Sequence, residues 1–171
     1  MICSETPSPM VPVAGLVRRA ESVGIGTYRD SAMSNEENKA VVRRFFAAVD
    51  DQDIDAVAAL LAPDYRLHFD GIPEMNREAG VGFFSAFLAA FPDITHQVQD
   101  QIAEGDRVAT RIVVSGTHQQ ELMGIPASGN EMSISATNMM RVDQGKIAEH
   151  WVSSGGVGML VQLGAMTAPG Q

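Results

Sequence analysis

The sequence has one cysteine, Cys3, so it cannot form a disulfide within the chain. It also has no apolar run of the ~20 residues that a membrane-spanning helix needs, and we expect no membrane partner. Basic residues are scarce, since 12 Lys and Arg compare with 21 Asp and Glu, and the net charge is −9. An acidic chain without basic clusters disfavours nucleic acid and anionic membranes as partners.

Several motifs that carry chemistry in other proteins are missing. The chain has no G-x-G-x-x-G motif, no P-loop, no G-x-S-x-G elbow, and no His, Asp and Glu set with the spacing of metal ligands. The spacing therefore predicts no metal site. The chain starts without the basic segment that precedes the apolar part of a secretory signal, and we expect a cytoplasmic protein.

A length of 171 residues suits one domain. Residues 1–32 are rich in Pro, Ser and Gly and show no sustained periodicity, which indicates a disordered leader or, alternatively, a misassigned start. We expect the folded domain to cover residues 33–166 and residues 167–171 to form a frayed tail.

Three helices are expected in the first half of the domain. Ser34-Asn35-Glu36-Glu37 has the S-x-x-E form of a capping box, and apolar residues at helical spacing extend this first helix to about Asp50. A shorter second helix covers Ile54–Leu61. The third helix, Asn76–Phe91, has several Phe residues on one side, a pattern that more often indicates core than a ligand site.

Alternating apolar and polar residues predict a series of strands. These are Tyr65–Phe69, Ile94–Ala103, Arg107–Gln120 and a long hairpin, Glu131–Ser154, that turns at Asp143-Gln144-Gly145. Helices followed by a run of antiparallel strands indicate an α+β fold. A strongly curved antiparallel sheet wrapped by about three helices would form a cone around an internal pocket, where ligands bind preferentially.

A set of short motifs occurs in a fixed order along the chain. They are Phe91-Pro92-Asp93, Glu104-Gly105-Asp106-Arg107-Val108, Gly116-Thr117-His118, Gly124-Ile125-Pro126 with Gly129, Arg141 with Gly145-Lys146-Ile147, Glu149-His150-Trp151 and Gln162-Leu163-Gly164. In this order and spacing, the motifs resemble the SnoaL-like polyketide cyclase and ester cyclase family of the nuclear transport factor 2-like superfamily. The resemblance covers about Asn35 to Gly164.

This resemblance implies a homodimer or higher homo-oligomer that pairs through a curved sheet. It also implies an intramolecular aldol ring closure of an aromatic polyketide, in which neither a metal ion nor an organic cofactor takes part. The family uses an Asp as acid and base and a nearby His from the preceding strand. Here the Asp position is Val152, a second common acidic position is Gly155, and the His position is Asn138. None of these side chains transfers a proton at neutral pH.

The remaining candidate catalytic residues are His150, Asn138 and His118. The family Asp position predicts that residues 150, 152 and 154 face the pocket. His150 is then either a proton shuttle with a pKa lowered by desolvation or a His that is only hydrogen-bonded to the backbone. Asn138 can polarise a ligand carbonyl. His118 either orients a substrate carbonyl at the pocket mouth or fixes the loop that follows it.

The candidate substrate-binding residues are Arg111, His68, Tyr65, Trp151 and Met140. His68 either faces the pocket beside Tyr65 or is a half-exposed strand residue. In the register that we expect, Trp151 covers the other face of the sheet, and a slip of one residue would turn it inward. Met140 belongs to a group of methionines that would give an adaptable apolar lining, together with Met123, Met132 and Met139.

Arg111 is a cation in an otherwise apolar strand and needs a partner if it is buried. It either grips an oxyanion or carboxylate of the ligand or pairs with Glu149, Glu131 or Asp100. His96 has the weakest case among the histidines, because Thr95-His96-Gln97 is typical of a solvated sheet edge.

We therefore predict a cofactor-independent cyclase or isomerase of natural-product biosynthesis that acts on a polyketide-like carbonyl compound. His150 would be the base, and Asn138 and Arg111 would stabilise the carbonyl. One alternative is an epoxide-opening cyclase or hydrolase in the same pocket. Another is a non-catalytic small-molecule-binding or assembly protein, which the lack of carboxylates in Val152–Gly156 favours. In each case the partner is a hydrophobic small molecule.

Overall fold

The described part of the chain contains six strands that form one sheet. A computed structural model describes residues 33–168 and 170, so the predictions for residues 1–32 and for the end of the tail lie outside the described residues. The strands are β1 (Leu61–Phe69), β2 (Met75–Asn76), β3 (Thr95–Glu104), β4 (Arg107–Thr117), β5 (Glu131–Asp143) and β6 (Lys146–Ser154). Their order across the sheet is β2-β1-β6-β5-β4-β3.

The prediction of a wholly antiparallel sheet is wrong at one position. Strands β3 to β6 pair antiparallel with their sequence neighbours, but β1 runs parallel to β6. Hairpin turns force antiparallel pairing only between strands that are adjacent in sequence. One helix and four strands lie between β1 and β6 in the sequence, so no tight turn sets their relative direction. The strong curvature and the cone shape stay predictions.

The β5–β6 hairpin turns where the sequence predicts it. Gln144 has φ +47° and Gly145 has φ +77°, and Asp143 pairs with Lys146 on either side. Two consecutive positive φ values are the requirement of a type I′ turn, whose twist matches that of the two strands. The turn sets the pairing next to it, and a register shift between Arg141 and Val142 then places His150 opposite Met140.

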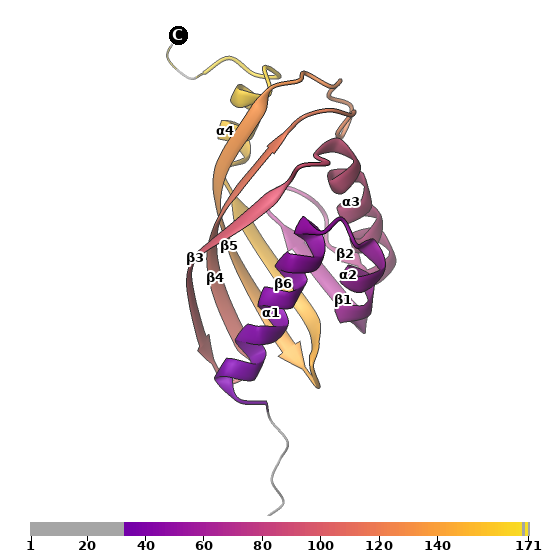
Figure 1. The fold of residues 1–171 in the computed structure, drawn as a ribbon, viewed down its shortest axis with the longest axis vertical. Helices are drawn as coiled ribbons and strands as arrows, with labels where there is room; N and C mark the ends of the chain where they lie inside the picture. The colour runs from indigo at the N-terminus through magenta and orange to yellow at the C-terminus, as the bar shows by residue number, and fades with distance from the viewer. Residues whose placement is uncertain (1–32, 169, 171) are drawn as a thin grey trace, which may run out of the picture. The chain divides into compact units, whose positions relative to one another are not determined.

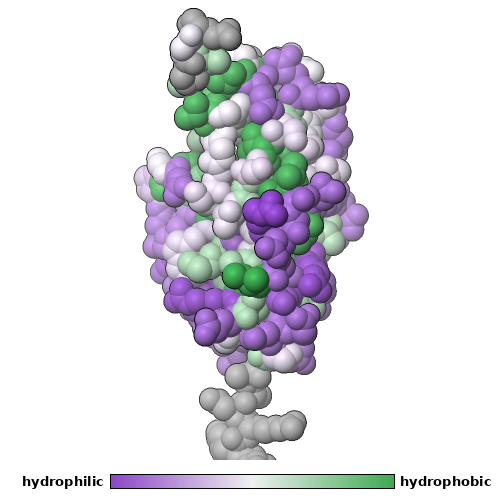
Figure 2. Space-filling model, turned by 90° about the vertical axis from the view of Figure 1, so that its left-hand side faces the viewer, coloured by the Kyte–Doolittle hydropathy of each residue, from purple (hydrophilic) through white to green (hydrophobic). Residues whose placement is uncertain are grey.

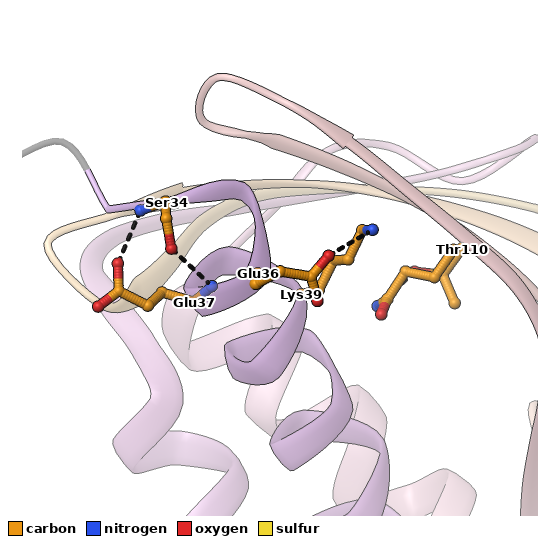
Figure 3. A network of polar contacts seen from close by, with 6 residues as sticks. Ser34, Glu36, Glu37, Lys39 and Thr110 are labelled. Atoms are coloured by element: carbon orange, nitrogen blue, oxygen red, sulfur yellow. Dashed lines mark hydrogen bonds and ion pairs between the residues drawn. The ribbon is translucent and has the colours of Figure 1, made fainter.

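The predicted helices are present with similar bounds. They are α1 (Asn35–Asp50), α2 (Ile54–Leu60) and α3 (Arg77–Ala90), and a short α4 (Gly156–Gln162) follows the sheet. The capping box at the start of α1 has both of its hydrogen bonds, because Ser34 and Glu37 each accept from the other's backbone N–H (Figure 3). No helix in the described ranges combines the length and apolarity needed to cross a membrane.

Helices α1 and α3 cover one face of the sheet, with α1 against β3 and β4 and α3 against β1 (Figure 1). On β4 the alternating residues Val108, Thr110, Ile112 and Val114 are buried under these helices, whereas their neighbours point to the opposite, outer face. Figure 2 shows the side of the domain on which the sheet is uncovered as a mosaic of hydrophilic and hydrophobic residues. The inner face is therefore the one that can hold an enclosed site.

Two segment boundaries differ from the sequence-based prediction. Strand β1 begins at Leu61 rather than Tyr65, so Pro63 lies inside a strand. A register shift between Leu61 and Arg66 interrupts the pairing with β6 there, and a residue without an N–H is tolerated at such an irregularity. Strand β4 ends at Thr117 rather than Gln120, because the backbone N–H of Gln119 bonds to Ala90 at the end of α3.

Helix α3 contains two glycines in very different surroundings. A Cβ on Gly80 would lie 3.0 Å from Cε1 of the buried Tyr65 ring, whereas a Cβ on Gly82 would meet nothing within 4 Å.

We predict that Gly82→Ala stabilises the protein by about 0.5–1 kcal/mol through helix propensity. The same change at Gly80 gains that propensity, but overpacking costs about 1–3 kcal/mol, so the variant should be less stable. Urea unfolding of both variants measures the difference. Equal stabilisation by both would show that Tyr65 moves freely.

Candidate functional site

An apolar cavity of about 120 Å³ lies between α1, α3 and the inner face of the sheet. Phe45 and Phe46 of α1 and Phe83, Phe84 and Phe87 of α3 form its aromatic wall. Apolar cavities of about 150 Å³ accept benzene, so this one has room for about one six-membered ring. Met123 lines the cavity and is 68% exposed, so a longer ligand can reach the surface there.

Four of the lining side chains carry polar groups, namely His96, Asn138, His150 and Ser154. His150, Val152 and Ser154 face the cavity and Trp151 faces the other way, which confirms the predicted register of β6. Val152, where the resemblance implies an Asp, contributes only an apolar surface.

His150 is held between two buried polar side chains. Its Nδ1 lies 3.1 Å from the hydroxyl of Tyr65, and its Nε2 lies 2.8 Å from Oδ1 of Asn138. Burial raises the pKa of Tyr65, so this hydroxyl keeps its proton. The consistent assignment has Tyr65 O–H donating to Nδ1 and His150 Nε2–H donating to Oδ1 of Asn138. We call this row of three side chains the Tyr65–His150–Asn138 chain.

Asn138 lies at one end of the Tyr65–His150–Asn138 chain and lines the cavity, as His150 does. The residue is 4% exposed, and no hydrogen-bond partner for its Nδ2 occurs among the described residues. A buried N–H donor without a partner costs about 1–3 kcal/mol. The amide is therefore a fixed donor, directed by the bond from His150 to its oxygen, in a cavity that has few other polar groups.

His150 is a weak base in this position. Desolvation by burial, with a smaller contribution from the nearby His68, lowers the pKa of His150 to about 3. Both ring nitrogens are already engaged, and the neutral form is the one that the Tyr65–His150–Asn138 chain requires.

The prediction that His96 lies at a solvated sheet edge is wrong. Its side chain is 9% exposed, it lines the cavity, and its Nδ1 lies 2.6 Å from Oδ1 of Asp50 at the end of α1. The sequence does carry one signal, because Ile94, His96 and Val98 alternate on one side of the strand. The partner Asp50 lies 46 positions earlier, and no local pattern connects the two.

His118 is fully buried but does not line the cavity. Its ring stacks on Phe91, and its Nδ1 accepts from the backbone N–H of Ser128. Backbone bonds also join His118 to Gly129 and Asn130. These contacts favour the loop-fixing interpretation of His118 over contact with a substrate.

Two predicted binding residues lie in the core behind the cavity. Tyr65 and Met140 are both fully buried, and neither is among the residues that line the cavity. Tyr65 acts on the cavity only through His150. Of the four methionines that were expected as lining, Met123 alone has that position, and Met159 of α4 joins it.

Three other candidate binding residues lie on the outer face of the sheet, where Trp151 was expected, whereas the placement of His68 and Arg111 in the pocket is wrong. His68 stacks on Trp151 with ring centroids 5.1 Å apart, and Arg107 lies over the Trp151 ring. Arg111 is exposed, so it needs no buried partner. It lies opposite Asp100 in the register without an ion pair to it, and Glu149 pairs instead with Arg141. Strand alternation explains these positions, because residues 107, 109 and 111 point away from the helices.

In the described ranges no three or more His, Cys, Asp or Glu side chains are grouped closely enough to hold a metal ion. The polar groups that face the cavity are two imidazoles, an amide and a hydroxyl. Such a set can bind a carbonyl and move a proton.

Known proteins share this fold and much of this sequence. Residues 40–163 match the family described as SnoaL-like polyketide cyclase. Among solved structures, AclR of Streptomyces galilaeus, provisionally described as a hydroxylase, is 32% identical, with a TM-score of 0.72 over 79% of this chain and 85% of its own. IdmH of Streptomyces antibioticus, provisionally described as a polyketide cyclase, is 37% identical, with a TM-score of 0.65 over 74% and 98%. TsrD of Streptomyces laurentii is 26% identical, with a TM-score of 0.70 over 78% and 99%. No curated protein sequence matches the chain.

The lowered pKa of His150 makes stability depend on pH. A His in the unfolded chain has a pKa near 6.5, whereas the folded value is about 3, so between these values only the unfolded chain binds this proton. The free energy of unfolding should fall by up to about 1.4 kcal/mol for each pH unit below 6.5 through this group alone. We predict that His150→Gln, which keeps a donor and an acceptor, loses this part of the slope.

Urea unfolding between pH 7 and pH 4.5 measures the effect. The stability difference between wild type and His150→Gln should shrink as the pH falls, whereas Thr137→Val, on the outer face of β5, should follow the wild-type curve. Parallel curves for wild type and His150→Gln would mean that His150 is not held neutral.

Proposed function

The chain belongs to the SnoaL-like polyketide cyclase family, and on this premise we propose that it binds a polyketide-like carbonyl compound in the inner cavity and cyclises or isomerises it. The carbonyl oxygen accepts a hydrogen bond from Nδ2 of Asn138. The apolar wall holds the carbon skeleton and keeps water away from the reacting atoms. A homodimer that pairs through the outer face of the sheet remains part of this proposal.

The unpartnered N–H of Asn138 is the observation that carries the proposal. Its donor is buried at an apolar wall and aimed by His150, and the wall offers few competing groups. A ligand carbonyl would relieve the cost of leaving this donor unpaired. A ligand with an amine or hydroxyl group in place of the carbonyl would bring its own donor into the same apolar surroundings and gain less.

This donor favours an enolate or alkoxide over a neutral carbonyl. Hydrogen bonds to an ionised acceptor are roughly twice as strong as neutral ones. The stabilisation therefore grows as negative charge develops on the oxygen, which is the requirement for catalysis rather than mere binding. The Tyr65–His150–Asn138 chain keeps the amide in place, so little reorganisation accompanies the reaction.

His150 acts in this proposal as a positioning residue for Asn138. A base with a pKa of about 3 and both ring nitrogens engaged accepts a proton poorly at neutral pH. The acidic positions of the family give no substitute, because Val152 is apolar and Gly155 caps α4 without lining the cavity.

Binding without turnover is the second candidate function, and the low basicity of His150 favours it. The two functions differ in one result. A protein that only binds will hold an aryl ketone without forming product from a reactive substrate.

We predict that Asn138→Leu, which removes the amide but keeps similar volume, weakens the binding of acetophenone about tenfold. A lost hydrogen bond of about 1.4 kcal/mol corresponds to this factor. Acetophenone is a suitable probe because it has one ring and one carbonyl. Titration calorimetry gives the affinity, and Thr137→Val, the neighbour on the opposite face of β5, is the matched control with unchanged binding.

Turnover is measured with an aromatic poly-β-carbonyl ester, and the cyclised product, an isomer of equal mass, is separated from the substrate by liquid chromatography before mass spectrometry. Wild type should form product, and Asn138→Leu should be about 10²–10³-fold slower, as for other lost oxyanion donors. Acetophenone binding without any product would favour the binding function. Unchanged acetophenone affinity in Asn138→Leu would contradict the proposed role of the amide.

A further inference from the structure

The last residue of α1 and the second residue of β3 meet at the cavity wall. Oδ1 of Asp50 lies 2.6 Å from Nδ1 of His96, and its Oδ2 accepts from the backbone N–H of His96 at 3.2 Å. The His96 ring stacks on Phe46, which also lines the cavity, with centroids 5.4 Å apart. Two contacts to one carboxylate and a stacked aromatic ring leave the imidazole little freedom to rotate.

These contacts set which nitrogen of His96 carries the proton. An ionised carboxylate can only accept, so Nδ1 is the donor in the bond to Asp50. The neutral ring then has its lone pair on Nε2, for which no hydrogen bond occurs among the described residues. Burial lowers the pKa of His96, and the bond to Asp50 opposes this shift. The neutral, proton-accepting form is therefore the one present at neutral pH.

The two cavity histidines thus differ in what they can do. Both nitrogens of His150 are hydrogen-bonded to other buried side chains, whereas His96 has one nitrogen fixed and one available. An imidazole oriented by a carboxylate, with its far nitrogen free, is the arrangement of general bases in hydrolases and other enzymes.

We propose that Nε2 of His96 is the proton acceptor of the cavity and that Asp50 is its positioning residue. This inference rests on the proposed function, for which it supplies the missing base. Nε2 takes a proton from a carbon between two carbonyl groups, and the electron pair of the broken C–H bond becomes the enolate. The enolate carbon then forms a bond to the carbon of a third, more distant carbonyl group of the same molecule. The resulting alkoxide takes the proton back from Nε2. Product and substrate are isomers, so no other reactant is consumed.

The sheet register also restricts the shape of the substrate. His96 pairs with Val114 and Asn138 pairs with Thr110, so the two groups lie four residues apart along β4. Four residues of a strand span about 13 Å. A ligand that reaches both groups is therefore longer than the one ring that the cavity encloses, extends beyond the cavity and carries more than one carbonyl, as a poly-β-carbonyl chain does.

The test compares His96→Gln and Asp50→Asn with His68→Gln, which changes a histidine on the outer face of the sheet. With the poly-β-carbonyl ester, His96→Gln should be about 10²–10⁴-fold slower in kcat, the usual contribution of a general base. Asp50→Asn keeps a side-chain acceptor but loses the charge, and should be slower by about tenfold or more. His68→Gln should react like wild type. Acetophenone binding, which reports on Asn138, should be the same in wild type, Asp50→Asn and His68→Gln, whose altered side chains do not line the cavity.

Two further measurements separate a catalytic role from a structural one. In the full chain, ¹⁵N chemical shifts of the imidazoles should show Nδ1 of His96 protonated and Nε2 unprotonated at pH 7. The kcat of wild type should fall on acidification below pH 6.5, as His96 becomes protonated, and Asp50→Asn should shift this limb. Within the described residues Asp50 is the one carboxylate in contact with His96, and His150 is the other titratable side chain that lines the cavity.

Full turnover by His96→Gln in the presence of an active wild type would overturn the role of His96 and leave the proposed function intact. A proton on Nε2 at pH 7 would overturn it whatever the activity. A wild type that forms no product would remove the proposed function, and the inference with it. Circular dichroism of each variant checks folding, and Asp50→Asn, in which His96 is still present, covers the case that His96→Gln does not fold.

Discussion

The Tyr65–His150–Asn138 chain is the constraint on which the site depends. Three polar side chains lie among Phe and aliphatic residues, where an unsatisfied polar group costs about 1–3 kcal/mol, and they persist because they satisfy one another. The pairing uses both nitrogens of His150 and the hydroxyl of Tyr65, and it leaves the Nδ2 amino group of Asn138 without a partner among the described residues. The position of Tyr65 also restricts α3, where the absence of a side chain at Gly80 leaves space for the Tyr65 ring.

The position of proton transfer follows from this arrangement. The chain has Val152, Gly155 and Asn138 where the family resemblance leads us to expect acids and a His, and burial lowers the pKa of His150 and keeps it neutral. The remaining candidate base at the cavity wall is the imidazole of His96, whose orientation is fixed by Asp50. Donor and base then come from different strands, so the carbonyl is held by β5 and the proton is removed from the direction of β3. Neither function requires a carboxylate in contact with the ligand.

Local patterns predicted the parts of this structure that local interactions determine. The capping box at Ser34 and the turn at Gln144 and Gly145 follow from residues within a few positions of one another, whereas the inward direction of His150 was implied by the family resemblance. The parallel pairing of β1 with β6 and the bond between Asp50 and His96 depend on segments far apart in sequence, and no periodicity reports on them. Strand alternation does predict the position of Arg111, because Val108, Thr110 and Ile112 are buried on one face and Arg111 alternates with them.

The most direct test of the central claim is a crystal structure of the protein with a bound aryl ketone. The account predicts a ketone oxygen about 2.7–3.2 Å from Nδ2 of Asn138, with His150 still bonded to Oδ1 and to Tyr65. A ketone oxygen turned away from Asn138, or an Asn138 amide whose nitrogen bonds to protein rather than to ligand, would contradict it.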